Sequence, residues 1–135
     1  MAFEGFRWGI DKTNKTTLLI PNKRLVTKRG FILGQNESGK TSAAQVYAEN
    51  LLRAGVTCVF IDLVGIWGPG LSLKANGKTA SEFSLAVFGG QHGFMELRPD
   101  MGEAIARLII EERFSTVLDL THLGADDKMK TVANV

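Results

Sequence analysis

The hydrophobic and polar positions of the chain switch between extended and helical patterns from residue 31 onward. Residues 39–54 and 99–113 carry apolar side chains at i, i+3 and i+4 spacing, which predicts helices with one apolar face, and a further helix is expected from residue 125. Strands that alternate with helices favour an α/β fold with a mainly parallel sheet flanked by helices. The apolar runs of strand type occupy residues 31–33, 56–61, 83–88 and 116–120.

Glycines and one long apolar run add expectations about helix ends and burial. Gly55 stands where the left-handed C-terminal cap of the first helix belongs. The nearly unbroken run 56–61 predicts a strand that is buried on both faces. The segment 63–78 is rich in glycine, and we expect an ordered loop without regular structure there.

Residues 3–30 predict a separate, short antiparallel β region. Phe6, Trp8 and Ile10 occupy alternate positions, and apolar pieces stand on both sides of the turn signal Pro21-Asn22. We therefore divide the chain into an N-terminal β-rich arm, residues 1–30, and a single core domain, residues 31–135.

The N-terminal arm is also the basic part of the chain. Residues 1–30 carry seven basic and two acidic residues, a local charge of +5, whereas the whole chain carries +2. A basic arm can bind nucleic acid or an acidic neighbouring subunit. It is equally compatible with a solvated charged face.

A phosphate-loop pattern joins the apolar triplet 31–33 to the first predicted helix. Residues 34–41 match G-x-x-x-x-G-K-[ST], in the strand-then-helix context that this motif requires. The two glycines allow the backbone to curl around phosphate oxygens, and the following helix N-terminus attracts the same anion. Lys40 can reach the terminal phosphates, and the Thr41 hydroxyl can ligate Mg²⁺. The predicted nucleotide-binding residues are Gly34, Gln35, Asn36, Glu37, Ser38, Gly39, Lys40 and Thr41.

Two acidic residues end predicted strands and are the candidate catalytic groups. Ligands of parallel sheets bind at the carboxyl ends of the strands, so we expect Gly34, Asp62, Gly89 and Asp119 to share one rim. Asp62 can assist Mg²⁺ or a water molecule, or it can cap the end of its own strand. Asp119 can act as a catalytic acid, but Leu120 occupies the position where a catalytic glutamate would be expected.

Other metal or redox chemistry is not expected. With two histidines, His92 and His122, and the single cysteine Cys58, we do not expect a zinc site. Cys58 lies within an apolar run, as suits a buried, reduced thiol in a cytosolic protein. No apolar stretch approaches membrane-spanning length, and the N-terminus lacks the apolar region of a signal peptide. We therefore expect a cytoplasmic protein with no membrane partner.

Taken in order, the motifs resemble the HerA/FtsK group of hexameric P-loop ATPases, and specifically its HerA-like branch. The resemblance covers roughly residues 15–135. It implies a P-loop NTPase-type fold, ATP and Mg²⁺ bound between neighbouring subunits of a ring, and movement or unwinding of DNA, often beside a nuclease. The stretches that carry it after the phosphate loop are Phe60-Ile61-Asp62 with Gly65 and Trp67, Val87-Phe88-Gly89-Gly90-Gln91-His92-Gly93, and Thr116-Val117-Leu118-Asp119-Leu120-Thr121.

The chain departs from this family at three places. Leu63 stands where proline often follows the acid, a minor change. Glu37 stands in the phosphate loop, where a small or neutral residue is more usual and a buried carboxylate would repel phosphates. Heterotrimeric G-protein α subunits, however, also carry Glu-Ser-Gly-Lys at this point, so this carboxylate can point outward. Most seriously, no strand ending in an Asp-Glu pair follows Asp119, so we expect an incomplete, truncated NTPase core.

These features leave open three hypotheses about function. The first is the ATP-binding core of a HerA/FtsK-like ring ATPase, a DNA translocase or helicase. The second is a short or truncated nucleotide-binding interaction module that does not hydrolyse ATP and is a partner in a larger ATPase–nuclease complex. A third, a small phosphoryl-transfer enzyme such as a nucleoside kinase, is disfavoured because the sequence lacks the basic lid and substrate-pocket arginines of such enzymes.

Overall fold

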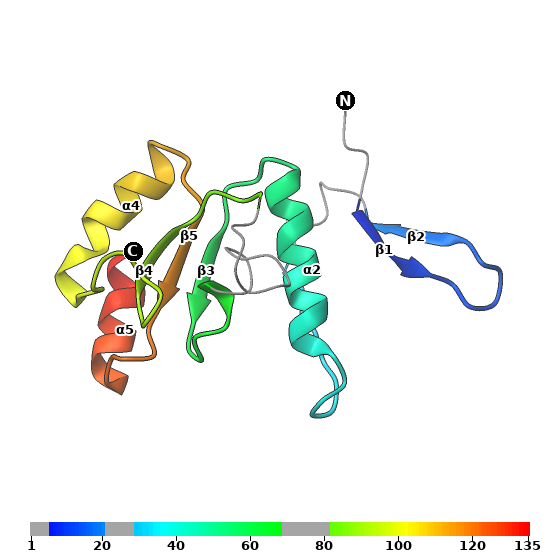
Figure 1. Ribbon diagram of the computed structural model, residues 1–135, viewed down its shortest axis with the longest axis horizontal. Helices are drawn as coiled ribbons and strands as arrows, with labels where there is room; N and C mark the ends of the chain where they lie inside the picture. Colours follow the sequence, from blue (N-terminus) through cyan, green and yellow to red (C-terminus); the bar gives the residue numbers. More distant parts are fainter. Residues whose placement is uncertain (1–5, 21–28, 69–81) are drawn as a thin grey trace. The chain divides into compact units, whose positions relative to one another are not determined.

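A computed structural model describes residues 6–20, 29–68 and 82–135 of the chain (Figure 1). The chain forms two compact units, Met1–Asn50 and Leu51–Val135. In chain order, the helices and strands are β1 (Phe6–Ile10), β2 (Thr17–Ile20), α2 (Lys40–Arg53), β3 (Val59–Asp62), β4 (Ala86–Gly89), the 3-10 turn η1 (Pro99–Met101), α4 (Gly102–Ile110), β5 (Thr116–Asp119) and α5 (Ala125–Asn134).

The first unit contains a separate antiparallel hairpin, which confirms the predicted N-terminal β region. Strands β1 and β2 pair with a register shift between Arg7 and Gly9. Their connecting loop is closed by Asp11, whose N–H donates to the carbonyl of Thr16 at 2.8 Å and whose Oδ1 accepts the N–H of Thr13 at 2.7 Å. Such side-chain-to-backbone bonds are why aspartate favours turns. The turn expected at Pro21-Asn22 lies outside the described residues.

Helix α2 confirms the helix predicted over residues 39–54 and its glycine cap. Gly55 has φ 74° and donates its N–H to the carbonyl of Leu52 at 2.9 Å, while the Val56 N–H donates to the carbonyl of Leu51 at 3.0 Å. These two bonds form a Schellman motif, in which a residue with positive φ satisfies the last free carbonyls of a helix. Gly55 is therefore required where the sequence places it.

The strand predicted at residues 31–33 does not form. The segment is irregular, and the side chains of Phe31 and Leu33 are 86% and 87% exposed. A strand is stabilised by its neighbours more than by its own propensity, and no described strand pairs with this triplet. The phosphate-loop motif therefore precedes a helix, as expected, but it does not follow a strand.

The second unit is built on a three-stranded parallel sheet in the order β3-β5-β4. All four residues of β4 and of β5 are buried. The prediction that residues 56–61 are buried on both faces is wrong: Val59 is 42% and Ile61 is 47% exposed. The reason is that β3 pairs only with β5, so in the described structure it is an edge strand. An α/β fold with a parallel sheet is confirmed, whereas its P-loop NTPase type stays a prediction.

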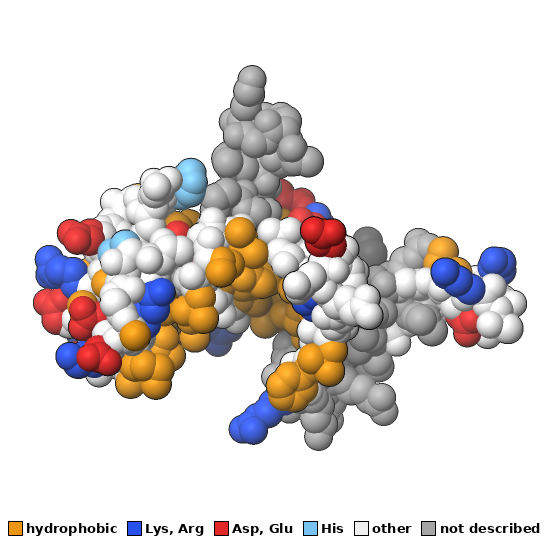
Figure 2. Space-filling view, turned by 90° about the horizontal axis from the view of Figure 1, so that it is seen from below, with side chains coloured by type: hydrophobic (Ala, Val, Ile, Leu, Met, Phe, Trp, Pro, Cys, Tyr) orange, Lys and Arg blue, Asp and Glu red, His pale blue; other side chains and the backbone are white. Residues whose placement is uncertain are grey.

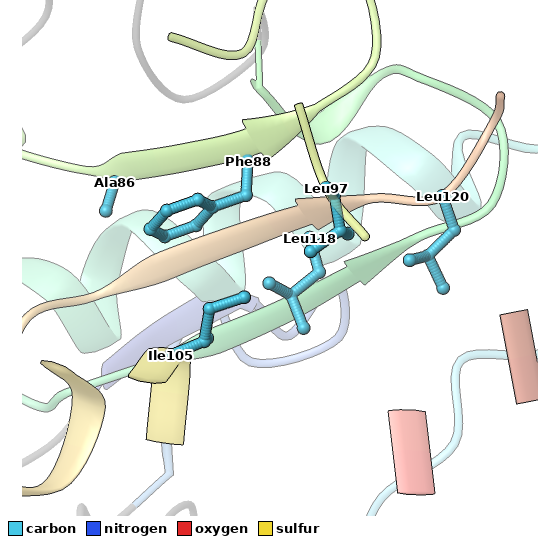
Figure 3. Close-up of a cluster of buried hydrophobic side chains, with 6 residues drawn as sticks. All are labelled: Ala86, Phe88, Leu97, Ile105, Leu118 and Leu120. Atoms are coloured by element: carbon cyan, nitrogen blue, oxygen red, sulfur yellow. The ribbon is translucent and has the colours of Figure 1, made fainter. Parts of the chain in front are cut away.

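The hydrophobic core of this unit lies between the sheet and the helices α4 and α5. Figure 3 shows its six buried side chains, which come from β4, β5, α4 and the residues that follow the two strands. Residues Met101, Leu108, Ile109, Leu123 and Val135 pack around them. The six core residues are Ala86, Phe88, Leu97, Ile105, Leu118 and Leu120.

Helix α4 is shorter than the predicted helix, which ran to about residue 113. It ends at Ile110, and Arg113 has φ 52°, outside the right-handed helical region. The N–H of Phe114 donates to the carbonyl of Leu108 at 3.3 Å, which turns the chain back toward β5. The helix therefore ends with its last apolar residue, Ile110, and the charged residues 111–113 lie in the turn that follows.

Apolar side chains also remain on the surface of the second unit. Figure 2 shows hydrophobic groups at several places on one face of the molecule. The most exposed include Ile110 at 73%, Val64 at 69% and Phe94 at 68%. No helix within the described ranges is long and apolar enough to cross a membrane.

Cys58 is a buried free thiol, as its place in an apolar run predicts. Burial raises the pKa of this thiol to about 11. Since the thiolate is the reactive form of cysteine, the thiol is unreactive at neutral pH and serves packing.

We predict that Ile105→Ala destabilises the protein strongly, because Ile105 is 1% exposed at the centre of the core. Removing its methyl and methylene groups leaves a cavity, and the expected loss is about 2–5 kcal/mol of unfolding free energy. The measurement is urea denaturation followed by circular dichroism. The matched control is Ile110→Ala in the same helix, which should change stability by less than about 0.5 kcal/mol. Equal losses in the two variants would contradict this core.

Candidate functional site

The phosphate-loop residues curl into a closed loop in front of α2. A Cβ added to Gly34 would lie 2.4 Å from Ser38 Oγ and 3.4 Å from Lys40 Cγ, so the start and the end of the loop touch. Gly39 has φ 85°, which favours glycine. The two glycines of the motif are therefore needed for different reasons, a close approach at Gly34 and a left-handed backbone at Gly39.

The closed loop leaves main-chain donors free at its helical end. Within the described ranges, the N–H groups of Gly39, Lys40 and Thr41 donate to no other group, as expected for the first residues of a helix. The Lys40 ammonium folds back along the loop and donates to the carbonyl oxygen of Gln35. Free N–H groups, a helix N-terminus and a lysine thus converge on one small region, which suits an anion.

Glu37 does not oppose an anion from within the loop. Its side chain is exposed to solvent, and its backbone has φ 62°. An exposed carboxylate is screened by water, so its repulsion of a bound phosphate is much smaller than that of a buried one.

In the second unit, three of the four residues expected at one rim lie in a single row. Asp62 is the Cα partner of Asp119 across β3 and β5, and Gly89 is the partner of Asp119 across β4 and β5. The parallel register therefore brings the carboxyl ends of all three strands together. Gly34 belongs to the other unit, and its position at this rim stays a prediction.

Asp62 caps the loop that follows its strand. Its side chain is fully buried; Oδ1 accepts the N–H groups of Val64 at 3.0 Å and Gly65 at 2.8 Å, and Oδ2 accepts the N–H of Trp67 at 2.7 Å. Both oxygens thus hold main-chain groups of the segment 64–67. Of the two roles considered for Asp62, the geometry supports the capping role. In the segment expected to be a loop, residues 63–65 form a bend, residue 66 has no regular structure, residues 67 and 68 are helical, and residues 69–78 lie outside the described residues.

Only one of the two carboxylate oxygens of Asp119 accepts such hydrogen bonds. Asp119 is 4% exposed, and its Oδ1 accepts both the N–H of Thr121 at 3.0 Å and the hydroxyl of Thr121 at 2.6 Å. Its Oδ2 lies against Gly90, where an added Cβ would be 1.9 Å away, and makes no hydrogen bond in the described structure. Gly90 has φ 63°, so both space and backbone require glycine there.

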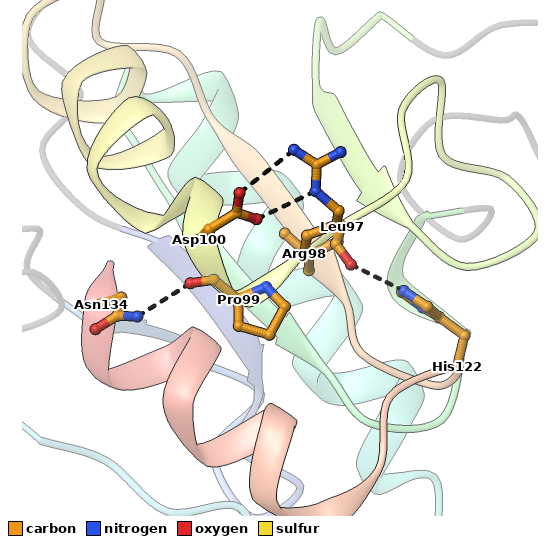
Figure 4. A network of polar contacts seen from close by, with 6 residues as sticks. All are labelled: Leu97, Arg98, Pro99, Asp100, His122 and Asn134. Atoms are coloured by element: carbon orange, nitrogen blue, oxygen red, sulfur yellow. Dashed lines mark hydrogen bonds and ion pairs between the residues drawn. The ribbon is translucent and has the colours of Figure 1, made fainter.

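His122 holds the glycine-rich turn to the end of β5, a role that the sequence did not suggest. Its Nδ1 accepts the N–H of Gly90 at 3.3 Å, and its Nε2 lies 3.1 Å from the carbonyl oxygen of Leu97 (Figure 4). Because a carbonyl can only accept, Nε2 carries the proton and Nδ1 is the acceptor. Nothing in the local sequence marks this histidine, since its partners lie 25 and 32 residues away.

The connection from Leu97 into α4 is fixed by two further contacts in the same view. Arg98 donates to both carboxylate oxygens of Asp100, and this hydrogen bond lowers the pKa of the Asp100 carboxyl. The Asn134 side chain at the end of α5 donates to the carbonyl of Pro99 at 3.0 Å (Figure 4). These contacts fix the start of α4 and the end of α5, and they form no part of a binding site.

The carboxyl ends of the strands enclose a pocket of about 290 Å³. Its lining combines Asp119 with His92, the exposed histidine of the glycine-rich turn, and with residues of the loops after β3, β4 and β5. The remaining lining residues are Val64, Gly65, Gln91 and Thr121. The described residues contain no group of three or more His, Cys, Asp or Glu side chains that could hold a metal ion.

Comparison of the chain with protein-family models, with curated proteins and with solved structures finds no match. The HerA/FtsK resemblance and the binding of ATP therefore stay predictions that rest on the residues described above.

We predict that Asp62→Asn destabilises the protein, because an amide cannot accept all three N–H groups that the carboxylate holds. One buried donor would be left unpaired, at a cost of about 1–3 kcal/mol in unfolding free energy. Glu112→Gln, at an exposed position, is the matched control and should leave the urea midpoint unchanged. An Asp62→Asn protein as stable as the wild type would argue that this carboxylate is not a cap.

Proposed function

We propose that residues 34–41 bind the phosphates of a nucleotide, with ATP and Mg²⁺ as the ligands. The observation that carries this proposal is the closed loop, in which a side chain at Gly34 would meet Ser38 and Lys40 while the first N–H groups of the helical end remain free. A phosphate at this end would accept those N–H groups and draw the Lys40 ammonium from the Gln35 carbonyl to its own oxygens. The Thr41 hydroxyl, one residue further along, would ligate Mg²⁺.

We propose further that this nucleotide site belongs to a HerA/FtsK-like ATPase that forms a ring and moves or unwinds DNA, beside a nuclease. Support comes from the family resemblance and from the basic arm, where Lys12 and Lys15 are exposed on the loop between β1 and β2. Lysine side chains neutralise DNA phosphates and release counterions, so exposed lysines suit a contact with DNA.

The second candidate function, nucleotide binding without hydrolysis, is favoured by the state of the two acids. Phosphoryl transfer needs an acid for Mg²⁺, a group that orients the attacking water, and a cation that offsets the developing charge. Asp62 is fully used as a cap, and Asp119 has one free oxygen with Leu120 after it. The described residues therefore offer a phosphate loop without a dedicated catalytic acid, as an interaction module would.

We predict that Lys40→Ala abolishes measurable ATP binding, since it removes the charge that reaches the terminal phosphates. Isothermal titration calorimetry with magnesium-ATP measures this directly. Lys12→Ala, which removes an exposed lysine outside the phosphate loop, is the matched control and should bind ATP as the wild type does. Thr41→Ala should weaken binding chiefly when magnesium is present. Unchanged affinity in Lys40→Ala would refute the nucleotide site.

We predict that residues 1–135 bind magnesium-ATP but hydrolyse it at close to the background rate, with no stimulation by DNA. A missing general base alone costs about 10²–10⁴ in rate. The measurement is phosphate release with and without double-stranded DNA. Turnover of about 1 s⁻¹ or faster, an ordinary enzymatic rate, would instead favour the ATPase hypothesis and assign Asp119 a catalytic role.

A further inference from the structure

The pocket at the carboxyl ends of the three strands contains the carboxylate of Asp119, which has no part in the proposed phosphate binding. Asp119 is 4% exposed, yet its Oδ2 has no hydrogen-bond partner in the described structure and is not sealed from the pocket. A carboxylate oxygen that opens into a pocket and receives no hydrogen bond from the protein can exchange its water for a donor of a ligand. Asp119 Oδ2 is therefore available to a ligand that carries N–H groups.

A second acceptor lies beside this oxygen. The Thr121 hydroxyl donates its proton to Asp119 Oδ1 at 2.6 Å, so only its lone pairs remain for another group in the pocket. Two neighbouring acceptors, one of them charged, match a group with at least two N–H donors. They do not match an anion.

The rest of the lining supports a positively charged ligand. Asp119 is the one acidic residue of the lining, and no lysine or arginine belongs to it. The side chains of Gln91 and His92 make no hydrogen bond or ion pair within the described ranges, so both are free to contact a ligand. Val64 offers an apolar wall for an alkyl stem. The volume of about 290 Å³ admits a small head group.

We propose that this pocket binds an alkylammonium or alkylguanidinium group, with Asp119 Oδ2 and Thr121 Oγ as its acceptors. The cationic group can come from a free small amine or from a lysine or arginine side chain of a protein partner. Binding in this pocket needs no nucleotide, so this proposal does not rest on the proposed nucleotide site.

The test is an NMR titration of the backbone amides of the full chain at neutral pH with methylguanidinium and methylammonium. Methylurea, a neutral molecule of similar shape to methylguanidinium, is the control ligand. Both cations should shift the amide signals of Gly65, Gln91 and Thr121 in a saturable way, with millimolar dissociation constants, and methylurea should not. Equal shifts with methylurea, or shifts of equal size at amides far from the pocket, would overturn the proposal.

Substitution of the acceptor separates this pocket from general charge attraction. Asp119→Asn keeps the size of the side chain and should weaken methylguanidinium binding at least about tenfold, because hydrogen bonds to charged groups are the strong ones. Asp126→Asn, at an exposed acid in α5, should leave binding unchanged. Wild-type affinity in Asp119→Asn would refute the assignment.

If Asp119→Asn does not fold, intermolecular nuclear Overhauser effects in the wild type decide the question. The methyl group of the ligand should show contacts to the methyl groups of Val64 and Thr121, and their absence at saturation would contradict the proposal. The source of the ligand is then found with the peptide acetyl-Gly-Arg-Gly-amide. Binding at least about tenfold tighter than methylguanidinium would indicate a protein partner, and equal binding would indicate a free small cation.

Discussion

The parallel pairing of β5 with both of its neighbours is the interaction on which the second unit depends. Its main-chain bonds place Asp62, Asp119 and Gly89 in one row and bring the loops after β3, β4 and β5 to the same rim. The same strand supplies Leu118 to the core, which binds the sheet to α4 and α5. A one-residue change of register would move Leu118 to the opposite face and break both arrangements.

At the carboxyl ends of the strands, main-chain N–H groups need the same aspartate oxygens that could bind a ligand. Each parallel strand ends in a loop whose N–H groups need acceptors, and a buried aspartate satisfies them at close range. Both carboxylate oxygens of Asp62 accept such N–H groups. In Asp119, one oxygen accepts hydrogen bonds from Thr121 and the other accepts none in the described structure. Gly90 and His122 hold the neighbouring turn close to Asp119, so a small pocket forms around the remaining oxygen. Asp62 and Asp119 therefore differ in the number of carboxylate oxygens that the loop after each strand uses as hydrogen-bond acceptors.

The two units carry binding features of opposite electrical character. In the first, free N–H groups, a helix N-terminus and Lys40 suit the phosphate that we propose as the ligand. In the second, a carboxylate with one open oxygen suits the cationic group that we propose for its pocket. A chain that holds a nucleotide on one unit and a cationic group of a partner on the other would suit an interaction module as well as a motor subunit.

The sequence by itself determined the features that depend on near neighbours along the chain. The start of α2 at the phosphate loop, its end at Gly55, the strand β5 and the helix α5 all follow from i, i+4 spacing, glycine chemistry and short apolar runs. The closed loop of residues 34–41 belongs here too, because the neighbours that leave no room for a side chain at Gly34 are Ser38 and Lys40, four and six positions away.

Only the tertiary structure decided which apolar residues are buried and which acids are free. Residues 31–33 and 56–61 look alike in sequence, but the first is an exposed irregular segment and the second leads into an edge strand, since burial depends on partners far along the chain. The shared row of Asp62 and Asp119, the bridge made by His122 and the single open oxygen of Asp119 arise from contacts between segments 25 to 57 residues apart. No local pattern encodes such contacts, because they exist only after β5 has paired with its two neighbours.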